Sequence, residues 1–133
     1  MAIGDSTAIV RTYLVAQATL AGIGIYSPRL PEGATLPAIG FFVRGGTSTP
    51  YIPTMPEPSY QFDCWADTPL QARQVYRLLY DVLQGIQNQA VVIGINTYYI
   101  VSAIEEVQGQ DVQDVEFPNY HRVIGMFKIM LRV

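Results

Sequence analysis

A segment in which a strand runs directly into a helix, residues 60–86, constrains the fold more than any other part of the chain. In its first part the side chains of Tyr60, Phe62 and Cys64 alternate with the polar Gln61 and Asp63. Alternation of this kind predicts a strand with one buried face and one wet face. A sheet built from such strands needs a second layer to cover its apolar side, which favours a fold of helices packed on a sheet.

The helix that follows is indicated by several signals at once. Thr68 is suited to cap its N-terminus, Pro69 fits the first helical position, and Gln71 completes a capping box. Gly85 marks its end. The apolar residues that recur at helical spacing are Ala72, Val75, Tyr76, Leu79, Val82, Leu83 and Ile86.

The remaining segments complete one domain, residues 1–133. In chain order we expect a helix at 5–21, strands at 24–26, 37–44 and 60–66, a helix at 68–86, and strands at 97–107 and 120–133. A brief extended piece is expected at 90–95, and an acidic loop at 108–119. The pattern predicts an α+β fold of order α-β-β-β-α-β-β, with a mainly antiparallel sheet of about four to five strands and two helices on one face.

Charged residues are scarce, and this limits what the surface can be. They make up 14% of the chain, whereas apolar residues make up 50%, and a typical soluble domain carries about 25% charged residues. Such a surface suggests a subunit that works in an assembly. The net charge of −3 gives no overall attraction to nucleic acid. The single cysteine excludes an intrachain disulfide.

Nothing in the sequence predicts a membrane protein. The N-terminus has no basic segment of the kind that begins a signal peptide. Residues 82–104 carry no charge, but they contain several Gln and Asn side chains, which are unfavourable within a bilayer. We therefore expect a soluble protein.

A proline-rich extended loop is expected at residues 47–59. Pro50, Pro53 and Pro56 recur every third residue, the period of a polyproline-II turn. The loop could be a polyproline ligand, a stiffened hairpin loop, or an arm that reaches a neighbouring subunit, and we favour the arm. Its candidate contact residues are Tyr51, Ile52 and Met55.

The last strand, residues 120–133, offers a second candidate contact surface. One face is expected to be buried. The other face carries Arg122, Lys128 and Arg132 among Ile124, Met126 and Met130. It could be a half-solvated outer face on which long basic side chains cover apolar neighbours. Alternatively it packs on another subunit or lines a channel.

Catalytic and metal signatures are weak. Cys64 and His121 could form a nucleophile and base if they met in space, but Cys64 fits a buried strand position better. A structural zinc site needs about four Cys or His ligands, more than the two that the chain has. Asp111, Asp114 and Glu116 lack the spacing of a calcium loop. The residues therefore predict neither a catalytic site nor a metal site.

Three segments together resemble the tail terminator proteins of tailed bacteriophages, also called tail completion or head–tail joining proteins. The first is Pro37-Ala38-Ile39-Gly40-Phe41-Phe42-Val43, which follows an N-terminal helix. The second is the strand ending in Trp65-Ala66, which leads through Asp67 and Thr68 into a helix with Ala72, Val75, Leu78 and Leu79. The third is the terminal strand, residues 120–133. The proline-rich loop departs from the family pattern.

The resemblance implies a structural virion protein with no enzymatic activity and no cofactor. Such a subunit forms a closed ring, expected to be hexameric, at the head-proximal end of the tail. There it ends growth of the tail tube and joins the tail to the head, and the genome can pass through its lumen. The implied partners are copies of the chain itself, the tail tube protein and a head-completion or connector protein, without a membrane. Assembly is expected in the host cytoplasm. The alternatives are another small neck component, such as an adaptor or head-closure protein, and a small Cys–His hydrolase or binding module.

Overall fold

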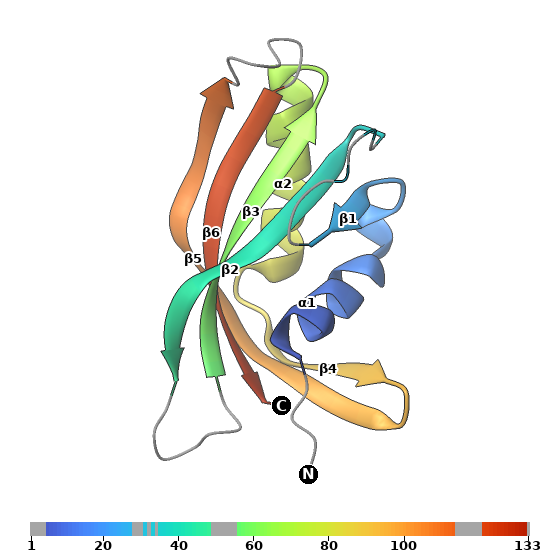
Figure 1. Cartoon of the computed structure of the whole chain (residues 1–133), viewed down its shortest axis with the longest axis vertical. Coiled ribbons are helices and arrows are strands. Elements are labelled where there is room, and N and C mark those ends of the chain that lie inside the picture. Colours follow the sequence, from blue (N-terminus) through green and yellow to red (C-terminus); the bar gives the residue numbers. More distant parts are fainter. Residues whose placement is uncertain are drawn as a thin grey trace.

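A six-stranded sheet forms the body of the computed structural model, which describes residues 5–27, 31, 33, 35–48, 56–113 and 121–132. The strands are β1 (Gly24–Tyr26), β2 (Ala38–Ser48), β3 (Pro56–Ala66), β4 (Gln87–Ile93), β5 (Asn96–Gln113) and β6 (His121–Arg132). Their order across the sheet is β1-β2-β3-β6-β5-β4 (Figure 1). Four of the five strand pairs are antiparallel, and β1 pairs with β2 in parallel.

Helix α1 (Ser6–Val15) confirms the first predicted helix but is shorter than residues 5–21. The Asp5 carboxylate caps it by accepting a hydrogen bond from the Thr7 amide at 3.0 Å. The α-helix ends because Gln17 has an extended backbone, and a short 3₁₀ helix follows at Ala18–Leu20.

Helix α2 (Pro69–Leu83) is capped as the sequence predicts. The Thr68 hydroxyl accepts a hydrogen bond from the Gln71 amide at 3.1 Å, and Pro69 is the first helical residue. The chain leaves the helix through Gly85, whose φ of +78° is readily adopted by glycine. None of the described helices is long and apolar enough to cross a membrane.

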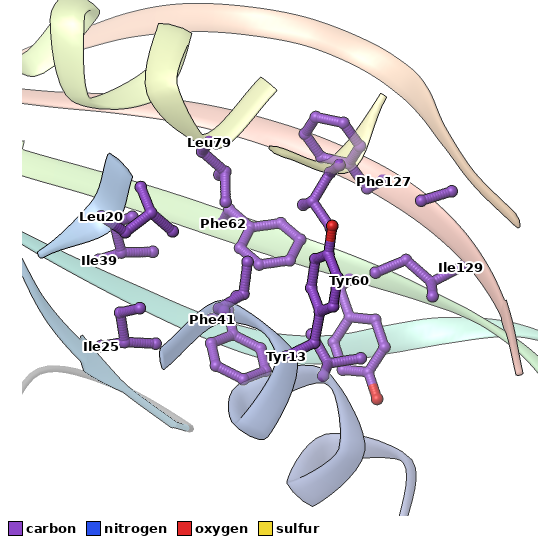
Figure 2. Close-up of a cluster of buried hydrophobic side chains, with 14 of the residues drawn as sticks. Tyr13, Leu20, Ile25, Ile39, Phe41, Tyr60, Phe62, Leu79, Phe127 and Ile129 are labelled. Carbon is purple, nitrogen blue, oxygen red and sulfur yellow. The ribbon is translucent and has the colours of Figure 1, made fainter. Parts of the chain in front are cut away.

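Both helices cover the same face of the sheet, and the core lies between the two layers (Figure 1). Aromatic rings from β2, β3 and β6 pack there, with the rings of Phe41 and Phe62 stacked 5.4 Å apart (Figure 2). The Tyr13 hydroxyl of α1 donates a hydrogen bond of 2.6 Å to the Val82 carbonyl of α2. The described residues include no buried charged side chain in this core.

The α+β class is confirmed, but the sheet is larger than the four to five strands expected. The piece expected at 90–95 is a full strand, β4, which starts at Gln87 and pairs with the first part of β5. Strand β5 itself continues to Gln113, so it includes the first half of the acidic loop expected at 108–119. Pairing with β6, interrupted by register shifts, holds this acidic segment in the sheet.

The proline-rich connection is shorter than predicted, because both flanking strands extend into it. Strand β2 continues to Ser48, and β3 already begins at Pro56. Pro56 and Pro58 pair with β2 only, since the pairing of β3 with β6 starts at Ser59. A proline lacks an amide hydrogen, so it is tolerated in a strand where one side needs no hydrogen bond.

Candidate contact surface on the outer sheet face

The sheet face opposite the helices, called here the outer face, is not covered by any described element (Figure 1). Alternation along β6 confirms the two predicted faces: Val123, Phe127, Ile129 and Leu131 are buried, whereas the side chains between them are partly exposed. All three predicted basic residues, Arg122, Lys128 and Arg132, therefore lie on the outer face. The sequence correctly placed them together.

Each of these basic groups has a partner on the same face. Lys128 Nζ lies 2.9 Å from Glu57 Oε1 on β3, and this hydrogen bond and charge raise the pKa of the lysine. The guanidinium of Arg122 lies 4.9 Å from the ring centre of Trp65. That of Arg132 lies 4.5 Å from the ring centre of Tyr99. Both distances suit a cation–π interaction.

A second chain of polar contacts crosses β2 and β3. Arg44 donates a hydrogen bond of 2.9 Å to Gln61, and Gln61 donates one of 3.0 Å to Asp63. Burial raises the pKa of Asp63, while the hydrogen bond from Gln61 and the charge of Arg122 act in the opposite direction. Ser59 adds a hydrogen bond of 2.5 Å to Glu106 on β5.

Apolar side chains fill the space between these charges. Ile124, Met126 and Met130 of β6 are partly exposed, and Ile104 of β5 has 55% of its surface exposed. The outer face is thus a mixed surface, on which Lys128 is paired with the Glu57 carboxylate while Arg122 and Arg132 lie against uncharged aromatic rings. A partner placed on it would bury apolar area, and it would have to offer acidic groups or hydrogen-bond acceptors to the arginines, because a buried unpaired charge is costly.

Sequence reasoning missed the partners of the basic residues. Glu57, Trp65 and Tyr99 lie far from β6 in the chain, and only the pairing of β3 and β5 with β6 brings them close. The alternation of residues 60–66 did signal that Asp63 faces outward. The other candidate contact residues, Tyr51, Ile52 and Met55, lie outside the described residues.

The Cys–His pair is a poor candidate for a catalytic site. Cys64 is fully buried in the core, and burial raises the pKa of its thiol. Nucleophilic attack requires the thiolate, which such an environment disfavours. His121, the first residue of β6, pairs with Ala66, which is two residues along β3 from Cys64.

An open pocket of about 350 Å³ lies between α2 and β5. It is lined by Arg73, Tyr76, Arg77, Tyr80, Glu105, Gln108 and Gly109. Arg77 is engaged with Asp81 at 3.3 Å, and the Tyr76 hydroxyl donates a hydrogen bond to Glu105. Within the described part of the chain, no three His, Cys, Asp or Glu side chains gather as metal ligands would.

No protein-family model and no curated protein matches the sequence. Among solved structures, the fold is similar to that of a chain in the virion of a native gene transfer agent (GTA) particle. The TM-score is 0.62, the sequence identity is 18%, and the match covers 96% of this chain and 95% of that chain. The two chains therefore share a fold over nearly their whole lengths.

Proposed function

We propose that this chain is a structural protein of a phage-like virion, and more specifically a ring-forming tail terminator. The observation that carries the proposal is the fold shared with a chain of a gene transfer agent virion, because the match leaves almost nothing of either chain unaligned. The resemblance of three sequence segments to tail terminators supports the narrower role.

In this proposal the subunits form a closed, hexameric ring at the head-proximal end of the tail. The ring ends growth of the tail tube, binds a head-completion or connector protein and leaves a lumen for the genome. A ring needs an interface between two different surfaces of the same subunit, with a rotation that closes. Assembly takes place in the host cytoplasm, and neither a membrane nor a cofactor is involved.

The outer face supports a role in contacts because it combines partly exposed apolar side chains with basic groups. Lys128 and Arg132 lie near residues of β3 and β5, respectively. The proposal includes no catalytic step, and the burial of Cys64 supports that part.

Light scattering of the protein, alone and with its tail tube protein, tests the proposal. We expect a ring mass in the presence of the tube, and tubes that are capped and stop growing when the protein is added. A protein that stays monomeric with the tube protein present, and leaves tube length unchanged, would contradict the proposal. Binding to a connector without binding to the tube would favour an adaptor or head-closure role instead.

A matched pair of variants ties the function to the outer face. Lys128→Ala with Arg132→Ala should weaken assembly, or change its salt dependence, while the melting temperature changes little, because exposed ion pairs contribute only about 0–1 kcal/mol. Arg77→Ala on the exposed side of α2 removes a similar surface pair and should leave assembly unchanged. Equal effects of both changes would argue against the outer face as the contact surface.

A further inference from the structure

Strand β4 forms one end of the sheet, and its composition is unusual for an exposed edge. It pairs with β5 on one side and with no described strand on the other. Edge strands are normally protected by charges, prolines or bulges, since their free main-chain groups can pair with another chain. From Gln87 to Ile93 the strand has no charge and no proline. Asn88 departs from strand geometry with a φ of +48°, but from Gln89 to Ile93 every residue pairs with β5 in one register.

The geometry of the β4–β5 hairpin shows which main-chain groups face outward. Its turn consists of Gly94 and Ile95, with a φ of +63° at Gly94, and it is closed by the pair Ile93–Asn96. In a hairpin with a two-residue turn, the closing residues exchange hydrogen bonds, and every second residue does the same. The amide and carbonyl groups of Val92 and Ala90 therefore point away from β5.

Exposed apolar side chains surround this edge. Val92 has 61% of its surface exposed, and Ile95 at the turn is fully exposed at 100%. Ala90 is also exposed, whereas Val91, between Ala90 and Val92, points into the core. An edge that offers both free hydrogen-bonding groups and apolar side chains is suited to strand addition.

A second free edge lies at the other end of the same sheet. Strand β1 pairs with Ala38, Ile39 and Gly40, and among the described strands the rest of β2 pairs with β3 alone. Ser27 satisfies the Phe41 carbonyl with a hydrogen bond of 2.8 Å, and beyond it Val43 is exposed over 47% of its surface. Figure 1 shows the lower half of β2 beside β3, with no drawn element along its other edge.

We propose that the β4 edge of one subunit pairs with the free edge of β2 in the next copy, so that the sheets join head to tail. This inference rests on the proposed function, because a ring requires two different surfaces that match each other. The two free edges lie at opposite ends of one sheet, which is the arrangement that lets each copy contribute one edge on either side. Symmetric β4–β4 pairing would close a dimer and leave the β2 edge free in both copies.

Proline substitution at an outward-facing amide tests the pairing. Ala90→Pro removes an amide that the β4–β5 hairpin does not use, so the monomer should fold. We expect subunit association in the presence of the tube protein to weaken about ten-fold or more. Ala90→Val keeps the amide and should associate normally, and circular dichroism checks that both variants are folded. Unchanged association of a folded Ala90→Pro protein would overturn the inference.

Cross-linking identifies the partner edge. Gln89→Cys and Val43→Cys place thiols on β4 and β2, both toward the helix-covered side of the sheet, while the buried Cys64 stays unreactive. Mixed in equal amounts and treated with a short bismaleimide, these two proteins should link to each other. Gln74→Cys on the exposed side of α2 serves as the control and should not link.

The outcomes separate this inference from the proposed function. Links between Gln89→Cys copies alone would overturn head-to-tail pairing in favour of a symmetric dimer. Rings that form without any link between β4 and β2 would overturn the edge pairing and leave the ring intact. A protein that stays monomeric with the tube protein present would overturn both.

Discussion

Gly125, in the middle of β6, allows the ring of Tyr76 to lie directly on the sheet, and this contact predicts a large effect of a small substitution. A Cβ atom at position 125 would lie 2.3 Å from Cε2 and 2.6 Å from the hydroxyl oxygen of Tyr76. Gly109 on β5 leaves space in the same way, since a Cβ there would lie 2.8 Å from Cε1 of the ring. The hydroxyl is held by its hydrogen bond to Glu105. The ring is thus fixed between two strands and cannot move without losing that bond.

Gly125→Ala should therefore lower the free energy of unfolding substantially. Overpacking in a well-packed site costs about 1–3 kcal/mol. A displaced Tyr76 would also lose a hydrogen bond to a carboxylate, which contributes about 1.5–3 kcal/mol. We expect a total of about 3 kcal/mol, which for a domain of this size corresponds to a melting temperature lower by about 10 °C. Urea unfolding followed by circular dichroism measures the difference.

Since the loss of stability in Gly125→Ala comes from a clash with the Tyr76 ring, removal of the ring should cancel it. In a Tyr76→Ala background, the added methyl group has room, and Gly125→Ala should cost less than about 0.5 kcal/mol. Tyr76→Phe is the matched control, because it keeps the ring and removes only the hydroxyl group. In the Tyr76→Phe background, the part of the Gly125→Ala cost that comes from overpacking should remain. Equal costs of Gly125→Ala in the wild type and in the Tyr76→Ala background would refute the reasoning.

Two further predictions concern titration. Burial raises the pKa values of Tyr13, Tyr60 and Tyr76 above the usual tyrosine value of 10.0, so the unfolded chain releases these protons first. The free energy of unfolding should therefore fall as the pH rises above about 10. Tyr76→Phe should make that fall shallower in urea titrations between about pH 9 and 11, and an unchanged slope would contradict it. Burial also raises the pKa of Asp63 above 3.8, so its ionised form opposes folding at neutral pH. Asp63→Asn should leave stability unchanged or raise it by up to about 1 kcal/mol at pH 7, and a clear loss would show that the charge is needed.

Most helices and strands could be predicted from the sequence because caps and side-chain alternation depend on residues that are close together in the chain. The cap at Thr68 and the alternation of Tyr60, Phe62 and Cys64 concern neighbours in the chain, and the structure confirms both. The extent of β4 and β5 was underestimated because Gln87–Ala90 and Gln108–Gln113 are polar or acidic segments with weak intrinsic strand preference. They are strands because they have partners, and a partner is not visible from within a segment.

The candidate contact surface could likewise be predicted only in part. That Arg122, Lys128 and Arg132 share one side of β6 follows from the two-residue period of a strand. Their contacts with Trp65, Glu57 and Tyr99 depend on strand order and register, which link residues more than thirty positions apart. These contacts of the basic side chains could therefore not be predicted from the sequence.

The strand order also decides when the molecule can fold during synthesis. Strand β6 lies at the centre of the sheet, between β3 and β5, yet the ribosome makes it after the other five described strands. Until β6 emerges, the β2–β3 and β4–β5 hairpins have no strand to join them, and β3 and β5 each present a free edge. The chain can therefore complete its sheet only after β6 has been made, and until then the newly made protein passes through a state with exposed strand edges in which a chaperone is most useful.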